Sequence, residues 1–447
     1  MRIITFLLSL ALLTNCTESA KQENYQKPNV ILIFADDLGY GDLSCYGSPV
    51  NKTPHLDKMA SQGIKLTSFY VAASVCTPSR AALLTGRYPI RHLPGNLGPE
   101  SKNGLPLDEV TIANLLKEQG YATAAFGKWH LGHATPEVLP TGRGFDTYYG
   151  LPYSNDMIKP WVQTEVPLMM YEDEKTVKEV QYEQQELTNE FTQKALNFIE
   201  NNQQKPFFIY LPYSMPHLPI AAPDNFLEKA DQNLYRAVIE NIDHGVGEIM
   251  DKLDALGLAD NTLLIFTSDN GPWHNLPDRM LQKGNERWHS GSVGPLRGAK
   301  ATSFEGGFRV PALLRWPAEF PAGVVSEQML TTMDLFATIA DVAQADVSKA
   351  KTIDGKNARS FLNGTSNTTP RDTLFYFRGK RLEAVRIKDL KYSIRTPENP
   401  ELFNLETDPS EMYNIVDRHP EKVAEMQSLI ESFAAETGAN LPQIQEN

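Results

Sequence analysis

The sequence predicts an α/β fold with a largely parallel central sheet sandwiched by helices. Continuous apolar, β-branched runs, typical of strands buried on both faces, alternate with stretches that have the three- and four-residue spacing of amphipathic helices. This alternation favours a parallel sheet covered on both faces. The expected strands span 29–35, 123–126, 206–211 and 262–267, and the clearest helices span 111–119, 187–201 and 235–256.

Charged or imidazole side chains follow each of the four strands. In strand order they are Asp36 and Asp37, Lys128 and His130, His217, and Asp269 and Asn270. Ligands of such sheets bind beyond the carboxyl ends of the strands, so the sequence predicts a site at this edge.

The oxygen-bearing side chains in this set suit a hard cation. Asp36, Asp37, Asp269 and Asn270 offer three carboxylates and an amide, which favour Ca²⁺ or Mg²⁺ over zinc. Either pair alone is explained equally well by helix caps or solvated turns. Two pairs at the ends of two strands favour the metal.

The stretch from Cys76 to Arg87, CTPSRAALLTGR, predicts a helix with Pro78 in its first turn. The free N–H groups and dipole of a helix N-terminus favour anions, and a thiol there is expected to ionise easily. A buried structural cysteine beside a capping serine is an equal alternative at this point.

Further cations and histidines are candidates for anion binding and proton transfer. Arg80, Lys128 and Lys300 can surround a negative group, and His130 and His217 can move protons near neutral pH. Each of them taken singly is more often a satisfied residue at the edge of the core, so the hypothesis depends on their convergence.

The composition is that of a globular protein with a substantial core, and its charge excludes one class of partner. The 447 residues are 41% hydrophobic and 22% charged. A net charge of −13 argues against nucleic acid as a partner, so any anion site must be a local concentration of positive charge.

The N-terminus predicts export. Met1-Arg2 and the apolar run from Ile3 to Leu13 indicate a signal peptide over 1–15, followed by a linker over 16–27. Leu13-Thr14-Asn15-Cys16 resembles a bacterial lipobox, so we expect a periplasmic or cell-surface protein with a lipid anchor at Cys16. Cys45 and Cys76 then remain, enough for one disulfide but no framework.

The chain divides into a domain over 28–362 and a C-terminal α+β subdomain over 370–447. Short strands are expected at 374–377, 383–387 and 390–395, before a helix over 420–437. The stretch 272–292 has little periodicity, and a long loop beside a site strand is more often functional than not.

The motif at Cys76 resembles the signature of type I, formylglycine-dependent sulfatases. Cys76-Thr77-Pro78-Ser79-Arg80 followed by Ala-Ala-Leu-Leu-Thr-Gly-Arg matches C-x-P-S-R-x-x-L-L-T-G-R at every fixed position. The resemblance is greatest to the arylsulfatase A and N-acetylgalactosamine-6-sulfatase branch, and it covers nearly the whole mature chain. Supporting segments are 35–42, 53–57, 127–132, 268–271, 305–311 and 401–411.

This resemblance implies an alkaline-phosphatase-like fold and a specific chemistry. Cys76 would be oxidised to formylglycine by a formylglycine-generating or anaerobic sulfatase-maturing enzyme, and a hydroxyl of its hydrate would attack the sulfur of a sulfate ester. Asp36, Asp37, Asp269, Asn270 and residue 76 would bind Ca²⁺, in preference to Mg²⁺. Arg80 and Asp269 would activate the nucleophile, and Lys128, Lys300 and His217 would hold the sulfate. His217 or Lys300 would protonate the leaving alcohol, and His130 would deprotonate the second hydroxyl to expel sulfate.

The resemblance also bears on the substrate. Exported bacterial members mostly act on sulfated polysaccharides or oligosaccharides, so we expect a sulfated glycan. Candidate sugar contacts are His92, Arg143, Trp273, Trp288 and His289, each equally well explained as an ordinary surface residue. The alternatives are a phosphonate or phosphate-ester hydrolase of the same superfamily, an inactive glycan-binding relative, and a purely structural Cys76. Ala299 and Ala301, which flank Lys300, replace glycines that are common in relatives.

Overall fold

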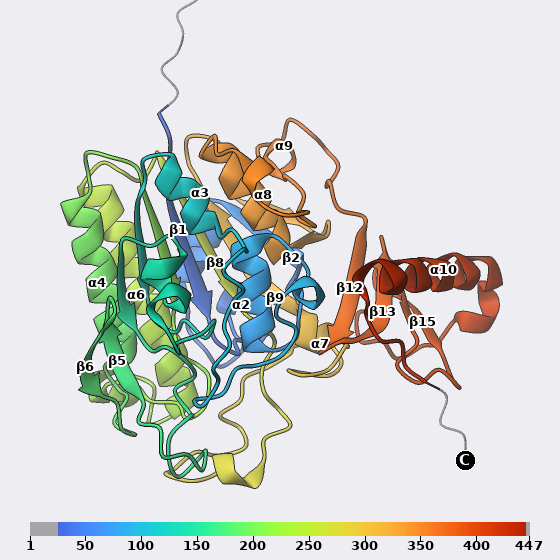
Figure 1. Cartoon of the computed structure of the whole chain (residues 1–447), viewed down its shortest axis with the longest axis horizontal. Helices are drawn as coiled ribbons and strands as arrows, with labels where there is room; N and C mark the ends of the chain where they lie inside the picture. Colours follow the sequence, from blue (N-terminus) through green and yellow to red (C-terminus); the bar gives the residue numbers. More distant parts are fainter. Residues whose placement is uncertain (1–25, 444–447) are drawn as a thin grey trace, which may run out of the picture.

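The computed structural model describes residues 26–443, which form a large α/β body and a smaller C-terminal part beside it (Figure 1). The body is built on an eleven-stranded sheet, and the C-terminal part contains a separate four-stranded sheet. The expected signal peptide and Cys16 lie outside the described residues. No helix within residues 26–443 is long and apolar enough to cross a membrane.

The centre of the large sheet is parallel, as the sequence predicts. β1 (Asn29–Ala35) lies between β7 (Phe207–Pro212) and β8 (Thr262–Ser268) and runs parallel to both. β3 (Ala122–Phe126) and β4 (Thr147–Gly150) extend the parallel set beyond β7. The carboxyl ends of these strands therefore meet at one edge of the sheet.

The flanks of the sheet are mixed, which the sequence pattern did not indicate. β9 (Arg309–Arg315) pairs antiparallel with both β8 and β2 (Ile64–Tyr70). β10 (Val324–Ser326) and β11 (Leu330–Thr331) run parallel to β2. At the opposite edge, β5 (Met169–Glu172) and β6 (Lys175–Glu179) form an antiparallel hairpin.

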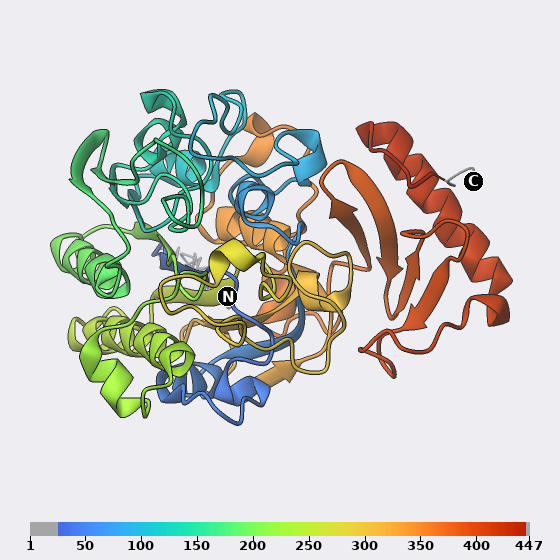
Figure 2. The same ribbon diagram turned by 90° about the horizontal axis from the view of Figure 1, so that it is seen from below.

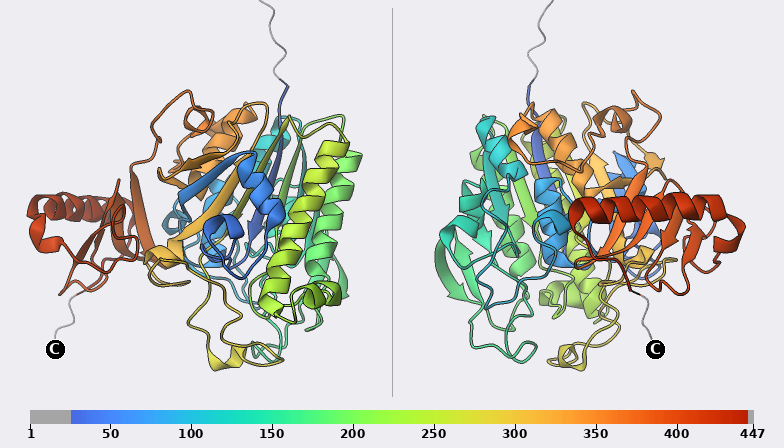
Figure 3. Two further views of the ribbon diagram at one scale, coloured as in Figure 1. Left: turned by 180° about the vertical axis from the view of Figure 1, so that it is seen from behind. Right: turned by 45° about the vertical axis from the view of Figure 1, so that its right-hand side comes forward.

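Helices cover both faces of the sheet because successive residues of its strands point to opposite sides. Val30, Leu32 and Phe34 of β1 belong to the apolar cluster that includes α2 (Cys76–Thr85), α3 (Ile112–Glu118) and α8 (Thr332–Val342). Ile31 and Ile33 belong to the cluster of α4 (Leu187–Asn201) and α6 (Leu234–Ala255). The left panel of Figure 3 shows α4 and α6 side by side on their face.

The remaining helices of the body are short. They are α1 (Pro54–Ser61), α5 (Asp224–Lys229), α7 (Glu305–Phe308) and α9 (Arg359–Leu362). The long loop after β8 crosses the carboxyl edge of the sheet (Figure 2), and its one regular element between residues 272 and 292 is a 3₁₀ turn at Asp278–Met280.

The C-terminal part is an antiparallel sheet with one helix across it (Figure 3, right). Its strands are β12 (Thr373–Arg378), β13 (Arg381–Ile387), β14 (Leu390–Ser393) and β15 (Glu401–Asn404), in that order. α10 (Pro420–Thr437) packs on this sheet, where the ring of Phe433 stacks on Phe375 with centroids 3.8 Å apart. The expected α+β subdomain is confirmed.

A buried ion-pair network joins this subdomain to the body. The Lys391 ammonium lies 3.0 Å from a carboxylate oxygen of Glu305, in α7, and 2.8 Å from one of Glu411. Burial alone would raise the pKa of Glu305, but Lys391, Arg386 and Arg309 outweigh it and lower that pKa to about 2. The two carboxylates are held next to each other because Lys391 lies between them.

Lys391→Met should therefore destabilise the folded chain. It leaves two buried carboxylates without their shared cation, a change that costs about 3–5 kcal/mol in comparable buried pairs. The measurement is the urea midpoint of unfolding. Lys422→Met removes an exposed lysine paired with Glu425 and is the matched control, expected to change little. Equal midpoints for the two variants would contradict the prediction.

Candidate active site

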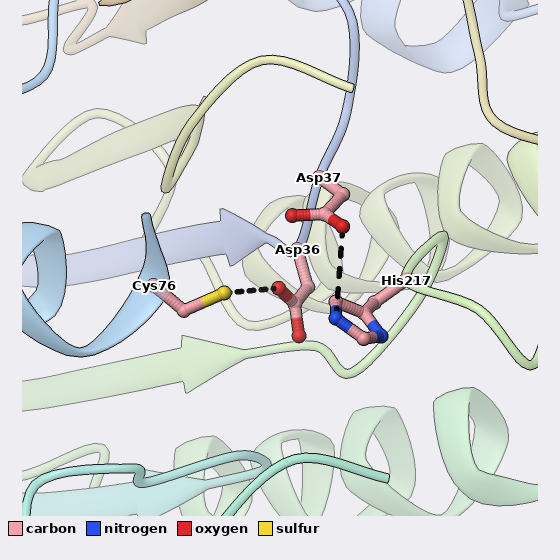
Figure 4. Close-up of side chains that lie close together, drawn as sticks. All are labelled: Asp36, Asp37, Cys76 and His217. Atoms are coloured by element: carbon pink, nitrogen blue, oxygen red, sulfur yellow. Dashed lines mark hydrogen bonds and ion pairs between the residues drawn. The ribbon is translucent and has the colours of Figure 1, made fainter. Parts of the chain in front are cut away.

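Residues from four strand ends and from the start of α2 meet at the carboxyl edge of the sheet. Figure 4 shows Asp36 and Asp37 after β1, Cys76 at the start of α2, and His217 after β7, with their side chains facing one another. One ligand atom from each of these four residues lies within 4.8 Å of the others. The convergence expected from the sequence is present.

Cys76 is the first residue of α2, and its side chain is buried against charged groups. Its Sγ lies 3.5 Å from Oδ1 of Asp36 and 3.3 Å from the Lys300 ammonium. Burial raises the pKa of the Cys76 thiol far above its usual value, although Lys128 and Lys300 act against this. The expectation of an easily ionised thiol at a helix N-terminus was wrong, because desolvation outweighs the helix end. Cys76 and Cys45 are both free thiols, so the disulfide alternative does not hold.

Arg80 lies one turn into α2 and is fully buried. Its Nε and Nη2 donate to Oδ2 of Asp269 at 3.0 and 2.8 Å, and its Nη1 donates to the Lys128 carbonyl at 2.9 Å. Such a fork fixes both direction and position. Arg80 therefore joins α2, the end of β3 and the end of β8.

The two lysines divide the paired carboxylates between them. Lys128 donates to Asp36 at 2.5 Å, and Lys300 donates to both oxygens of Asp37 at 2.7 and 2.9 Å. Burial would raise the pKa of Asp36, but Lys128, Arg80 and Lys300 together lower it. Burial raises the pKa of Asp37 to about 7: Lys300 opposes this, while the neighbouring Asp36 and Asp269 add to it. At Asp37, therefore, the cost of burying the carboxylate outweighs the attraction of Lys300.

The two histidines are buried and neutral. Burial, with Lys128 and Arg80 nearby, lowers the pKa of His130 well below its usual value. Its Nε2 lies 2.9 Å from the Leu97 carbonyl, while its Nδ1 has no hydrogen-bond partner among the described residues. Since a carbonyl only accepts, Nε2 carries the proton and Nδ1 has a free lone pair. His130 is therefore set up as a proton acceptor.

In His217 the ring nitrogen that contacts a backbone carbonyl is Nδ1, whereas in His130 it is Nε2. Nδ1 of His217 lies 2.5 Å from the Leu218 carbonyl, and its Nε2 lies 3.6 Å from Oδ2 of Asp37. Burial lowers its pKa well below the usual value, and Lys300 and Lys128 add to this. The lone pair of Nε2 faces the carboxylates.

The oxygen-rich set fits a divalent cation. Asp37 is contacted from the end of β8 by two groups: its backbone N–H donates to Asp269, and it accepts from the Asn270 amide at 2.6 Å. Oδ1 of Asn270 is buried and has no hydrogen-bond partner within the described part of the chain. A buried acceptor without a donor, next to a carboxylate whose pKa burial raises, is what a bound cation would satisfy. His217 also lies in this group, although the resemblance implied for it a role in holding the sulfate and protonating the leaving alcohol.

A close backbone approach sets the position of Asn270. The next residue, Gly271, packs so tightly on Gly306 that an added Cβ would lie 1.8 Å from the Gly306 carbonyl oxygen. The Gly271 N–H also donates to the Gly307 carbonyl at 3.1 Å. A glycine is therefore needed at position 271, where the chain that follows Asn270 passes α7.

The five candidate sugar contacts fall into three groups. Trp273 belongs to the site, since its ring lies 5.6 Å from that of His217 and 5.0 Å from the Lys300 ammonium. Trp288 is 72% exposed on the loop after β8, and His289 follows it. His92 and Arg143 are not brought to the cluster. His92 contacts Thr85, at the opposite end of α2 from Cys76, and Arg143 donates to the carbonyls of Pro106 and Glu109.

Sequence reasoning missed the segment after β4. Ser154 lies 3.2 Å from the Lys128 ammonium, and the nearby Asp156 is buried with its pKa raised by that burial. β4 is short and only partly apolar, so it was not recognised as a strand. The rule that located the other site residues would have found Ser154 once β4 was known.

Comparison with known proteins agrees with this geometry. The family model described as "Sulfatase" matches residues 28–345, and the model "N-sulphoglucosamine sulphohydrolase, C-terminal" matches residues 299–436. The first match alone spans more than half of the chain.

Individual relatives cover most of the chain. It is 36% identical to human arylsulfatase A over 442 residues (87% of this chain, 83% of the relative). It is 38% identical to N-acetylgalactosamine-6-sulfatase of Canis lupus familiaris over 387 residues (82% and 71%). The solved structure of Ps i-CgsB in complex with k-i-k-neocarrahexaose is 34% identical, with a TM-score of 0.79 and coverage of 92% and 93%.

A phosphonate monoester hydrolase of Agrobacterium radiobacter shares the fold alone, at 20% identity and a TM-score of 0.64. A family match of this extent, together with the convergent site, assigns the chain. It belongs to the sulfatase family, the sulfuric ester hydrolases of alkaline-phosphatase-like fold.

Proposed function

We propose that this sulfatase hydrolyses sulfate esters of a glycan, with Cys76 converted to formylglycine and Ca²⁺ held by Asp36, Asp37, Asp269 and Asn270. The observation that carries the proposal is the burial of Cys76 against Asp36 and Lys300 at the start of α2, where a thiol is poorly placed to ionise. A residue in this position is useful as an aldehyde hydrate and not as a thiolate. The formylglycine hydrate would supply the attacking hydroxyl, and a bound cation would supply Lewis acidity.

Positive charge is available where the sulfate oxygens would lie. Lys128 contacts Asp36 and Lys300 contacts Asp37, and both lysines are buried. In a water-excluded site, fixed charges of this kind stabilise the developing negative charge of a transferring group strongly. Arg80 fixes the position of Asp269 relative to α2, and so to residue 76, because its Nε and Nη2 both donate to Oδ2 of Asp269.

The proton acceptor is best assigned to Nδ1 of His130, the one ring nitrogen of that residue with a free lone pair. Its lowered pKa keeps this lone pair available at mildly acidic pH. For the proton delivered to the leaving alcohol, the geometry favours Lys300 over His217. Lys300 carries protons on its ammonium, whereas the lone pair of His217 Nε2 faces the cluster.

Several observations support a carbohydrate substrate. Trp273 places an aromatic face beside Lys300, and aromatic faces are frequent platforms for apolar sugar faces. One solved relative holds a carrageenan oligosaccharide, and one curated relative is named for a sulfated amino sugar.

Mass spectrometry of the peptide that contains residue 76 tests the modification. In chain produced with a sulfatase-maturing enzyme, the peptide should show the aldehyde mass in place of the thiol mass. Cys76→Ala should lose all sulfate-ester hydrolysis and keep its affinity for sulfated oligosaccharides. An unmodified thiol in fully active enzyme would contradict the proposal. If Cys76→Ala kept full sulfate-ester hydrolysis, the role of Cys76 would be structural.

Removal of the cation should lower thermal stability, since a ligand bound to the folded state alone stabilises it. Dialysis against a chelator should lower the melting temperature, and Ca²⁺ should restore it more fully than Mg²⁺. Asn270→Ala should show a much smaller Ca²⁺-dependent shift. Asp278→Ala, whose carboxylate is 92% exposed, is the control and should respond like the unaltered chain. A melting temperature indifferent to the chelator and to Ca²⁺ would count against the site.

A comparison of esters separates the sulfatase from its superfamily alternative. Matured enzyme is assayed with 4-nitrophenyl sulfate, 4-nitrophenyl phosphate and bis(4-nitrophenyl) phosphate, and then with defined sulfated oligosaccharides, reading free sulfate. We expect kcat/KM to be highest for a sulfated oligosaccharide. A dominant phosphodiesterase rate would overturn the proposal in favour of a phosphate- or phosphonate-ester hydrolase.

A further inference from the structure

A cavity of about 420 Å³ lies beside Lys300, on the side that faces the C-terminal subdomain. Trp273, Lys300 and Phe304 line it from the body, and Arg378, Glu383 and Arg395 line it from the subdomain. Its volume lies within the range of small-ligand pockets. The cavity is therefore built by both parts of the chain.

Backbone bonds hold this cavity against the reacting centre. The Lys300 N–H donates to the Pro272 carbonyl at 3.0 Å, and the Ala301 N–H donates to the Ser74 carbonyl at 2.8 Å. The ammonium of Lys300 reaches Cys76, whose Sγ is 3.3 Å away. Lys300 thus contacts Cys76 and also lines the cavity, which places the cavity next to the reacting centre.

Most charges that line the cavity already have partners. Lys300 is bonded to Asp37, and Glu383 accepts from Arg381 at 2.7 Å and from the Ser303 hydroxyl at 2.6 Å. Arg395 lies over the ring of Phe304, 3.9 Å from its centroid, and donates to Glu401.

Arg378 differs from these residues. It is exposed at the end of β12, and its side chain makes no hydrogen bond or ion pair with any residue in the range 26–443. The unpaired guanidinium of Arg378 and that of Arg395 line the same cavity, where they place positive charge on a chain of net charge −13. This arrangement has no evident use in holding the fold together.

We propose that this cavity binds a second anionic group of the substrate, carried by the sugar next to the one that loses its sulfate. Arg378 and Arg395 would recognise a sulfate or a carboxylate there, since guanidinium binds both with paired hydrogen bonds. Trp273 would lie between the two anionic groups, under the sugar ring. The inference rests on the proposed function and narrows it to glycans charged on adjacent sugars.

The test compares matched disaccharides as inhibitors of 4-nitrophenyl sulfate hydrolysis, so that they need not be cleaved. All carry galactose 6-sulfate, linked to neutral galactose, to glucuronate or to a second sulfated galactose. We expect inhibition constants about tenfold lower for the two doubly charged compounds, as a net charged hydrogen bond provides. Which of the two binds more tightly distinguishes a carboxylate from a sulfate partner.

Arg378→Ala, alone and with Arg395→Ala, should remove the difference between charged and neutral neighbours. Arg418→Ala is the matched control, because it removes an exposed arginine of the same subdomain outside the cavity. Equal inhibition by all three disaccharides, or a difference that survives in the double variant, would overturn the inference. Calorimetric titration of the same compounds measures affinity directly. If no sulfate ester is hydrolysed, the proposed function fails, and calorimetry still decides whether the cavity selects charge.

Discussion

Two adjacent carboxylates, Asp36 and Asp37, are buried at the end of the central strand, and the rest of the site compensates for them. Charged groups enter a protein interior only with partners. Lys128, Arg80 and Lys300 provide these partners from three different elements, and burial still raises the pKa of Asp37 to about 7. In the proposed function, a divalent cation would stabilise this buried carboxylate in its ionised form.

The need to pair these buried carboxylates with cations also explains why parts of the chain far from the site support it. Lys300 comes from the loop that precedes α7, and α7 is fixed to the C-terminal subdomain through Glu305, Lys391 and Glu411. The subdomain thus contributes no atom to the reacting centre, yet it braces the loop that neutralises Asp37. Arg378 and Arg395 of the subdomain also line the cavity beside Lys300.

Much of the fold could be predicted because buried parallel strands have a strong local signature. The runs at β1, β7 and β8 are apolar throughout, and the carboxyl-end rule then located Asp36, Asp37, His217, Asp269 and Asn270. β4 and the β5–β6 hairpin are short and partly exposed, so their periodicity is weak and Ser154 was missed. The high pKa of Cys76 also could not be read from its position on a helix, because burial is a tertiary property. His92 and Arg143 were expected in loops near the site, and packing places their side chains elsewhere.

The burial of Cys76 sets an order of events in the life of the chain. Only 2% of the residue is exposed, and Asp36 and Lys300 lie against its sulfur, so the folded chain offers another enzyme almost no access to it. Any conversion of this side chain must happen while the segment is still extended, during or just after synthesis. On the proposed function, folding sets a time limit for this conversion: a molecule that folds first would keep its thiol, and the active fraction of a preparation would depend on which of the two processes is faster.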